Sequence, residues 1–243
     1  MHLSVIIPAK NEEKIIRKTV ESVFAHCSGR GWEHEIIVVA NNSTDTTASV
    51  VKECAVSMSS VRLIEYHGHP GKGYAVRTGM LGARGDFRLF MDADNSTTID
   101  NVDAMLPFFK EGYDVVIASI AIEGSTVASG SEPIWRRLFG KLGNLWIQIF
   151  AVPGIWDTQR GFKVVTANAA EDIFSVAKID GWGFDVEMLA LARKFKHRIK
   201  EVPIHWKNDG SQTKVGLSAY VQVLKDTLRV RWYLLTRAYS RHA

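Results

Sequence analysis

Two aspartates stand one residue apart in the stretch FRLFMDADNSTTID, which runs from Phe87 to Asp100. A short apolar run precedes Asp92 and Asp94, and small polar residues follow them. At the end of a strand, where the chain turns, both carboxylates can reach one hard cation. Mg²⁺ is commonly held by one or two carboxylates together with phosphate and water. The pair is therefore a candidate site for Mg²⁺ or Mn²⁺, but D-x-D alone is a weak signal.

A calcium loop and an acidic turn without chemistry are the competing interpretations of this stretch. An EF-hand loop requires glycine at its sixth position and glutamate at its twelfth, and this chain has Thr97 and Asp103 there. The preceding residues also have the pattern of a strand, whereas an EF-hand begins with a helix. These mismatches exclude the calcium loop and leave a choice between a metal site and an acidic turn.

Glycines flank a lysine in a second stretch, HPGKGYAVRTGM. Gly71 and Gly73 permit a close backbone approach, and the N–H groups and dipole at a helix N-terminus favour anions. Lys72 and Arg77 can add charge-assisted contacts to a phosphate. A helix start with solvated basic residues is the alternative interpretation.

Two further polar turns follow apolar runs, PAKNEE after the first run and VVANNSTDTT after the second. Pro8 ends the first run, and Asn11 and Glu12 fall in the turn behind it. Either turn can also be an ordinary helix start, with acidic residues in the first turn or with Ser43 or Asp45 as the N-cap.

The elements that must position these turns alternate along the chain. Strands are expected at residues 3–9, 34–41, 61–66, 87–94 and 114–119, and helical patterns at 12–27, 43–57, 71–83 and 101–112. Strands separated by helices predict βαβ units, hence an α/β fold with a mostly parallel sheet. Ligands of such sheets bind beyond the carboxyl ends of the strands, so the polar turns should meet at one edge.

The second half of the chain contains long amphipathic segments. Residues 135–152 place Trp135, Leu138, Phe139, Leu142, Leu145, Trp146, Ile149 and Phe150 on one helical face. Residues 217–235 carry a stripe of Leu217, Val221, Leu224, Leu228, Trp232 and Leu235. Ordinary packing against the sheet and peripheral contact with a membrane both fit such helices. We expect one domain over residues 1–215 and an amphipathic C-terminal helix over residues 216–243.

Composition sets the broad class. The 243 residues are 46% hydrophobic and 23% charged, with a formal net charge of +4. These values are typical of a soluble globular domain, and they fit an anionic ligand or an acidic membrane surface. No feature points to nucleic acid. Neither a signal peptide nor a run long enough to span a bilayer is apparent. We therefore expect a cytoplasmic location, with peripheral contact at the cytoplasmic membrane face as the alternative.

Six motifs occur in an order that resembles the family 2 glycosyltransferases of the GT-A fold. They are SVIIPAKNEE, GKGYAVRTGM, FMDAD, DTQRGFK, WGFDVEML and VPIHW followed by GSQTK. More narrowly, the chain resembles the polyprenyl- and dolichyl-phosphate hexosyltransferases. DTQRGFK and FDVE look closest to the dolichyl-phosphate glucosyltransferase branch.

The resemblance implies a Rossmann-like sheet, a nucleotide-sugar donor such as UDP-glucose or GDP-mannose, a Mg²⁺ or Mn²⁺ ion, inversion at the anomeric carbon and a lipid-phosphate acceptor. By position it assigns Pro8, Ala9, Asn11, Glu12 and Lys72 to the nucleotide-sugar site, Asp92 and Asp94 to the metal, Gln159 and Arg160 to the sugar and acceptor, and Asp185 to a catalytic carboxylate. Of the two metal residues, Asp94 is expected to be the more direct ligand and Asp92 to face the nucleotide.

The chain departs from the family pattern in two places. Ala40, Asn41 and Asn42 replace the first residues of the family's DDGSTDGT, so base recognition falls to the Asn41 amide or to backbone groups, and uracil versus guanine stays open. Ile120 stands where an arginine usually holds the acceptor phosphate. Either Arg136, Arg137, Lys207 and Lys214 take over this role, or the acceptor is not a lipid phosphate.

The acceptor decides what catalysis requires. A phosphate monoester is partly dianionic at neutral pH and needs no strong base, whereas a sugar hydroxyl needs one. Asp185 or Asp157 would then be the base, but Asp185 can also be a helix N-cap. The resemblance therefore implies a metal-dependent inverting hexosyltransferase acting on a polyprenyl or dolichyl phosphate. The alternatives are transfer to a soluble sugar or glycoside and a nucleotide-sugar-binding protein with weak catalysis. The oligomeric state is open.

Overall fold

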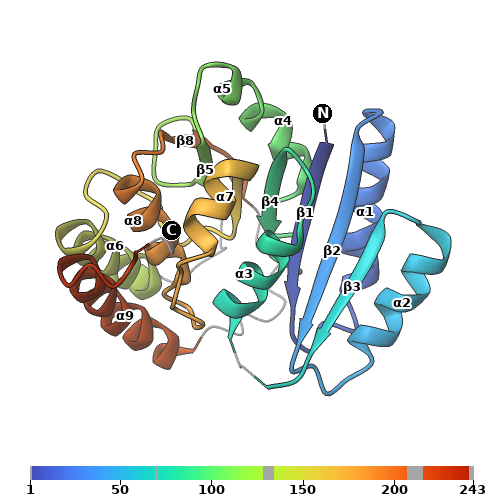
Figure 1. Cartoon of the computed structure of the whole chain (residues 1–243), viewed down its shortest axis with the longest axis horizontal. Coiled ribbons are helices and arrows are strands. Elements are labelled where there is room, and N and C mark those ends of the chain that lie inside the picture. The colour runs from blue at the N-terminus through green and yellow to red at the C-terminus, as the bar shows by residue number, and fades with distance from the viewer. Residues whose placement is uncertain (1, 69–70, 128–133, 207–215, 241–243) are drawn as a thin grey trace.

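A seven-stranded sheet with the order β3-β2-β1-β4-β7-β5-β8 forms the centre of the computed structural model, which describes residues 2–68, 71–127, 134–206 and 216–240 (Figure 1). The strands are β1 (His2–Ala9), β2 (Glu33–Asn41), β3 (Val61–Tyr66), β4 (Phe87–Met91), β5 (Val115–Ser119), β7 (Phe162–Thr166) and β8 (Ile199–Pro203). All neighbours are parallel except that β7 runs antiparallel to β4 and β5. The short strands β6 (Thr126–Val127) and β9 (His205–Trp206) pair separately. The predicted mostly parallel α/β sheet is confirmed.

Helices cover both faces of this sheet. They are α1 (Ile16–Gly29), α2 (Thr47–Ser57), α3 (Lys72–Gly82), the 3₁₀ turn η1 (Ile99–Asn101), α4 (Val102–Met105), α5 (Pro107–Lys110), α6 (Ile134–Phe150), α7 (Ala167–Phe174), α8 (Phe184–Lys194) and α9 (Leu217–Leu235). Successive strand residues enter different cores: Ile6 packs on the face of α3, α7 and α8, and Val5 packs on the face of α1 and α2. Because both faces are covered, the central strands β1 and β2 contain continuous buried apolar runs at residues 5–7 and 36–40.

The observed boundaries differ from the predicted ones where the chain turns. The fourth strand ends at Met91, so Asp92 and Asp94 lie beyond it in the turn. The predicted helix at 101–112 is broken into η1, α4 and α5, and Pro107 is the first residue of α5. Proline removes a backbone donor and clashes with the preceding turn, and therefore interrupts a helix at this point.

Most described members of the apolar stripes on α6 and α9 are exposed rather than turned toward the sheet. On α9, Val221, Leu228, Trp232 and Leu235 are exposed, and the buried positions are Ala219, Asp226, Thr227 and Val230. On α6, Leu142, Leu145 and Ile149 are exposed, whereas Ile147 is buried. The two helices pack against each other, side by side in Figure 1. Ordinary packing against the sheet does not account for these exposed residues, and the side chains of Trp135, Leu138, Phe139 and Leu217 lie outside the described residues. In the described part of the chain no helix is long and apolar enough to cross a membrane.

Gly79 tests how tightly α3 packs on the sheet. A Cβ atom at Gly79 would overlap the Ile6 side chain of β1, and overpacking of a core costs about 1–3 kcal/mol. We expect Gly79→Ala to lower the free energy of unfolding by that amount in chemical denaturation. Gly143→Ala on α6 is the matched control, because a Cβ there meets nothing within 4 Å. It should stabilise the helix by about 0.5–1 kcal/mol, and equal effects of the two substitutions would contradict the packing.

Candidate functional site

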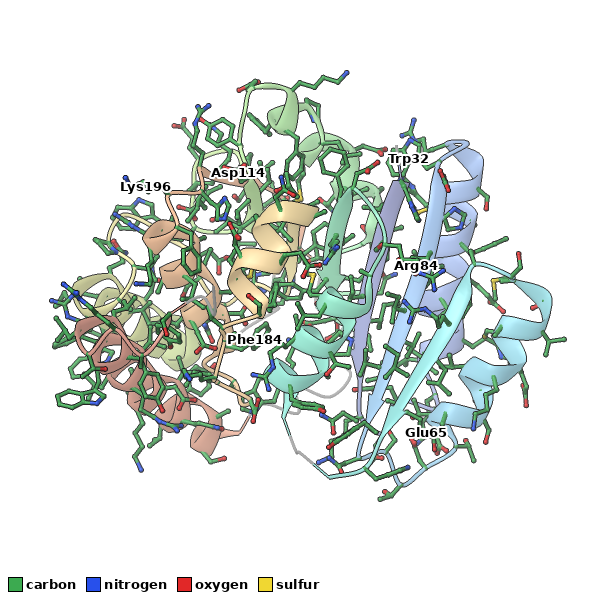
Figure 2. The ribbon with its side chains drawn as sticks, viewed as in Figure 1. Trp32, Glu65, Arg84, Asp114, Phe184 and Lys196 are labelled. Carbon is green, nitrogen blue, oxygen red and sulfur yellow. The ribbon has the colours of Figure 1, made fainter. Side chains whose placement is uncertain are left out.

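The carboxyl ends of β1, β2 and β4 meet at one edge of the sheet because these strands are parallel neighbours. Figure 2 shows this edge near Glu65 at the end of β3, and shows Trp32 and Asp114, which precede β2 and β5, at the opposite edge. Asparagine turns the chain behind each of the three strands: Asn11, Asn42 and Asn95 have φ of 55°, 53° and 54°. Asparagine is among the few residues that enter this left-handed region readily. The predicted convergence of the strand-end turns is therefore present.

The turns behind β1 and β2 hold each other in place. The Asn11 side-chain oxygen accepts from the Thr44 N–H at 2.8 Å, and the Glu12 N–H donates to the Thr47 hydroxyl at 2.8 Å. Asp45 accepts from the Thr47 N–H at 3.0 Å, but Thr46 is the N-cap of α2 and makes no side-chain capping bond. The predicted Ser43 or Asp45 cap is thus wrong by one position or more, and the polar side chains of these turns fix the rim of the site.

The glycine–lysine turn packs against the loop of residues 178–183, which joins α7 to α8. A Cβ atom at Gly71 would overlap the Asp180 carbonyl oxygen, and one at Gly73 would overlap the Ile179 carbonyl oxygen. Asn41, which is 4% exposed, donates from its side-chain amide to the Gly71 carbonyl at 3.0 Å. The glycines are therefore required by contact with this loop, and Asn41 fixes the turn from the other side.

Four charged side chains alternate in sign beyond β4. Lys72 Nζ lies 2.5 Å from Asp92 Oδ1, and Lys163 of β7 forms a buried ion pair with Asp185 of α8. Burial raises the pKa of the Asp185 carboxyl, and the Lys163 and Lys72 ammonium groups oppose the shift. Burial lowers the pKa of Lys72, but the Asp92 and Asp185 carboxylates outweigh it, so that the pKa lies above its ordinary value. Lys72 therefore stays charged at neutral pH.

The two predicted metal residues differ in their surroundings. Asp92 is partly buried against Gly161, where a Cβ atom would overlap its carboxylate. Asp94 is exposed, and its Oδ1 accepts from the Ser96 N–H at 2.9 Å. Among the described residues no cluster of three or more His, Cys, Asp or Glu side chains forms a metal site. Two carboxylates on one turn still fit Mg²⁺ or Mn²⁺ when phosphate and water complete the shell.

A second group of polar residues lies between β5 and β7. Asp157 Oδ2 accepts from the Ile120 N–H at 3.0 Å and lies 3.5 Å from Arg160 Nε. Glu201 of β8 accepts from the backbone N–H of Asp157 at 3.0 Å. The Arg160 guanidinium stacks 4.8 Å from the centre of the Trp206 ring. These contacts hold Asp157 and Arg160 beside the position where the family's arginine is replaced by Ile120.

Comparison with known proteins agrees with this geometry. Residues 4–166 match the Glycosyl transferase family 2. The chain belongs to this family. It is 33% identical to the dolichyl-phosphate beta-glucosyltransferase of Dictyostelium discoideum over 97% of this chain and 76% of the relative. The corresponding human enzyme is 32% identical over 98% of this chain and 77% of its own length.

Solved structures with low sequence identity share the fold of this family 2 glycosyltransferase. Mannosyl-3-phosphoglycerate synthase from Rubrobacter xylanophilus has a TM-score of 0.72 at 19% identity, over 100% of this chain and 77% of its own. Glucosyl-3-phosphoglycerate synthase from Mycobacterium tuberculosis, in complex with UDP, has a TM-score of 0.68 at 17% identity, over 99% and 81%. The predicted GT-A fold and the predicted glycosyltransferase class are confirmed.

Several predicted site residues have surroundings that differ from one another. Arg77 pairs with Asp180 at 2.6 Å and donates to the Ala177 carbonyl, so its side chain is turned toward the 178–183 loop rather than toward Asp92. Pro8 and Ala9 end β1 at the site edge, and the Gln159 side chain is exposed. Arg136 and Arg137 begin α6, but their side chains lie outside the described residues, as do Lys207 and Lys214. The binding roles assigned to all these residues stay predictions.

Sequence reasoning missed the partner of Asp185 in this glycosyltransferase. Asp185 is not the helix N-cap, which is Gly183, but a residue in the first turn of α8 with an exposed fraction of 3%. Its partner Lys163 is 0% exposed and is the second residue of β7. A lysine inside the apolar run FKVV was the available signal, because a lysine is almost never buried without a partner.

The buried Lys163–Asp185 pair predicts that substitutions at its two residues have coupled effects on the free energy of unfolding. Removing one member of a buried pair costs about 3–5 kcal/mol because it leaves an uncompensated charge. We expect Lys163→Met to lower the free energy of unfolding by that amount in urea denaturation, and Lys163→Met with Asp185→Asn to recover about 1–3 kcal/mol of it. Lys110→Met at the exposed end of α5 is the control and should be close to neutral. Strictly additive losses in the double variant would contradict a direct pair.

Proposed function

We propose that this chain transfers a hexose, with glucose as the first candidate, from a nucleotide sugar to the phosphate of a polyprenyl or dolichyl phosphate, with inversion and with a divalent metal. The similarity to dolichyl-phosphate beta-glucosyltransferases over nearly the whole chain supports the substrate class. The ion pairing of the two candidate bases supports a phosphate acceptor, because Asp185 is paired with Lys163 and Asp157 with Arg160.

An acceptor that needs no base fits this arrangement. Asp185 is buried and ion-paired, and Asp157 already accepts from the Ile120 N–H and lies beside Arg160. Neither carboxylate is therefore placed to abstract a proton from a sugar hydroxyl. A phosphate monoester is already partly dianionic at neutral pH, so orientation and charge compensation are sufficient to let it attack the anomeric carbon.

On the donor side, we assign binding of the diphosphate to Lys72 and to the turn behind β4, which carries Asp92 and Asp94. Lys72 begins α3 and stays charged beside Asp92, so it can exchange this carboxylate for a phosphate oxygen. Asp92 and Asp94 would hold the Mg²⁺ or Mn²⁺ ion together with the diphosphate. Such an ion neutralises the charge that develops on the departing nucleotide. Glucosyl-3-phosphoglycerate synthase, which shares the fold, has been crystallised with Mn²⁺ and UDP, which supports the same use of metal here.

Asp94 tests the metal assignment. Asp94→Ala should lower kcat for glucose transfer from UDP-glucose to polyprenyl phosphate by about 100-fold or more, since even residues that only support a metal ligand contribute about 10–100-fold. The fold should persist, because Asp94 is exposed and its described side-chain bond is local. Asp100→Ala, an exposed acid of the same segment, is the control and should keep full activity.

The same assay separates the alternatives. Retained turnover of Asp94→Ala would remove the metal assignment. Transfer of the hexose from UDP-glucose or GDP-mannose to an added soluble sugar or glycoside, without transfer to polyprenyl phosphate, would favour a soluble acceptor. Binding of UDP without turnover of either donor would favour a binding protein with weak catalysis.

We also propose that the exposed faces of α6 and α9 contact a lipid surface. Leu142, Leu145 and Ile149 of α6 and Leu228, Trp232 and Leu235 of α9 are exposed on adjoining helices, and Trp232 is 64% exposed. Lys225, Arg229 and Arg231 lie on exposed positions of the same helix. An amphipathic helix with apolar and basic residues binds anionic membrane interfaces, and this contact would bring the site to a lipid-linked acceptor.

Flotation with vesicles of anionic phospholipid tests this surface. At low salt the protein should float with the vesicles, and Leu228→Glu with Trp232→Glu should lower the bound fraction by at least about fivefold, because charged residues are expelled from the interface. Val56→Glu on α2 is the control, since Val56 is 90% exposed far from α9 along the sheet. Failure of the unmodified protein to float at low salt would contradict the lipid contact.

A further inference from the structure

The loop of residues 178–183 is held between the glycine–lysine turn and α9. On the side of the turn, a Cβ atom at Gly71 or Gly73 would overlap the loop backbone. On the side of α9, a Cβ atom at Gly181 would overlap the Gln222 amide, and one at Gly183 would overlap Asp226. The backbone of the loop is therefore in close contact with α9 on one side and with the turn that carries Lys72 on the other.

A buried carboxylate fixes the start of this loop. Glu187 of α8 is 1% exposed, and its two oxygens accept from the Lys178 N–H at 2.8 Å and the Ile179 N–H at 2.9 Å. The Tyr239 hydroxyl donates to the same carboxylate at 2.7 Å. Burial raises the pKa of Glu187, and the three donors oppose that shift. Burial and the adjacent carboxylate also hold the pKa of Tyr239 well above its ordinary value, so Tyr239 remains a donor.

The other side of the loop reaches the residues that would meet the donor. The Tyr74 N–H donates to the Asp180 carbonyl at 3.1 Å, and Arg77 pairs with the Asp180 carboxylate. The Trp182 ring centre lies 5.5 Å from Lys72 Nζ. None of the steps in the proposed transfer uses Glu187 or Tyr239, yet both lie in the contact chain that ends at Lys72.

We propose that Glu187 and Tyr239 are positioning residues, which hold the 178–183 loop against the Gly71–Lys72 turn and thereby set the affinity for the diphosphate of the donor. The identity of that ligand rests on the proposed function. The hydroxyl of Tyr239, which follows α9, donates to the Glu187 carboxylate. The same carboxylate accepts from the backbone N–H groups of Lys178 and Ile179 and so holds the start of the loop. The pair acts through the loop and does not touch the reacting atoms.

Amide hydrogen exchange of the ligand-free protein tests directly whether Glu187 and Tyr239 hold the 178–183 loop in place. Tyr239→Phe removes one hydrogen bond to a charged group and should increase exchange about 3–10-fold in residues 71–77 and 178–183. Exchange in β1, β4 and β7 should not change. Tyr113→Phe is the matched control, because Tyr113 lies before β5 and stacks on Arg198, away from the loop. Unchanged exchange in Tyr239→Phe, or an equal change in Tyr113→Phe, would overturn the proposal.

Measurement of the affinity for UDP tests whether the two residues affect donor binding. By calorimetry with Mg²⁺, Tyr239→Phe and Glu187→Gln should each weaken UDP binding about 3–10-fold, and the double variant should be no weaker than the worse single one, because both act in one contact chain. In turnover the same factor should appear in KM for UDP-glucose with kcat within about twofold. A lowered melting temperature with unchanged UDP affinity would assign the pair a structural role only. UDP binding without transfer by the unmodified protein would refute the proposed function but leave the exchange and affinity results to decide this inference.

Discussion

The buried ion pair between Lys163 and Asp185 is the interaction around which the site is arranged. A charge of either sign is costly in a protein interior unless a partner lies beside it. Lys163 comes from the antiparallel strand β7 and Asp185 from the first turn of α8. Their pairing ties the inserted strand to the helix at the sheet edge where Lys72 and Asp92 meet. Positive and negative groups alternate there, so an anionic ligand and a cation can enter together without leaving a net charge buried.

Small residues permit this arrangement. Gly161 leaves room for the Asp92 carboxylate, and Gly71 and Gly73 let the lysine turn lie on the 178–183 loop. The same loop lies on α9, whose apolar face is turned outward. The proposed donor site at the strand ends and the proposed lipid-contacting surface are therefore joined by one short segment. This proximity is what a transferase needs when its two substrates come from water and from a membrane.

Local pattern was sufficient to predict much of this molecule. The positions of the strands follow from hydrophobic periodicity. The location of the polar turns and of the D-x-D pair at one edge follows from the rule that parallel sheets bind ligands at their carboxyl ends. The orientation of α9 was not predictable in this way, because Gln222 and Asp226 pack on Gly181 and Gly183 and Val230 enters the core, whereas most of the described apolar stripe is exposed. The Lys163–Asp185 pair and the use of Arg77 on Asp180 depend on long-range contacts that no periodicity encodes.

We infer that Asp92 and Asp94 hold a divalent ion only together with a diphosphate, because two carboxylates are too few on their own and Asp92 is already paired with Lys72. Calorimetric titration of Mn²⁺ into the protein, with and without saturating UDP, tests this claim most directly. We expect UDP to tighten Mn²⁺ binding by at least about tenfold, which is a coupling of about 1.4 kcal/mol. Equal affinity for Mn²⁺ in the presence and absence of UDP would contradict it.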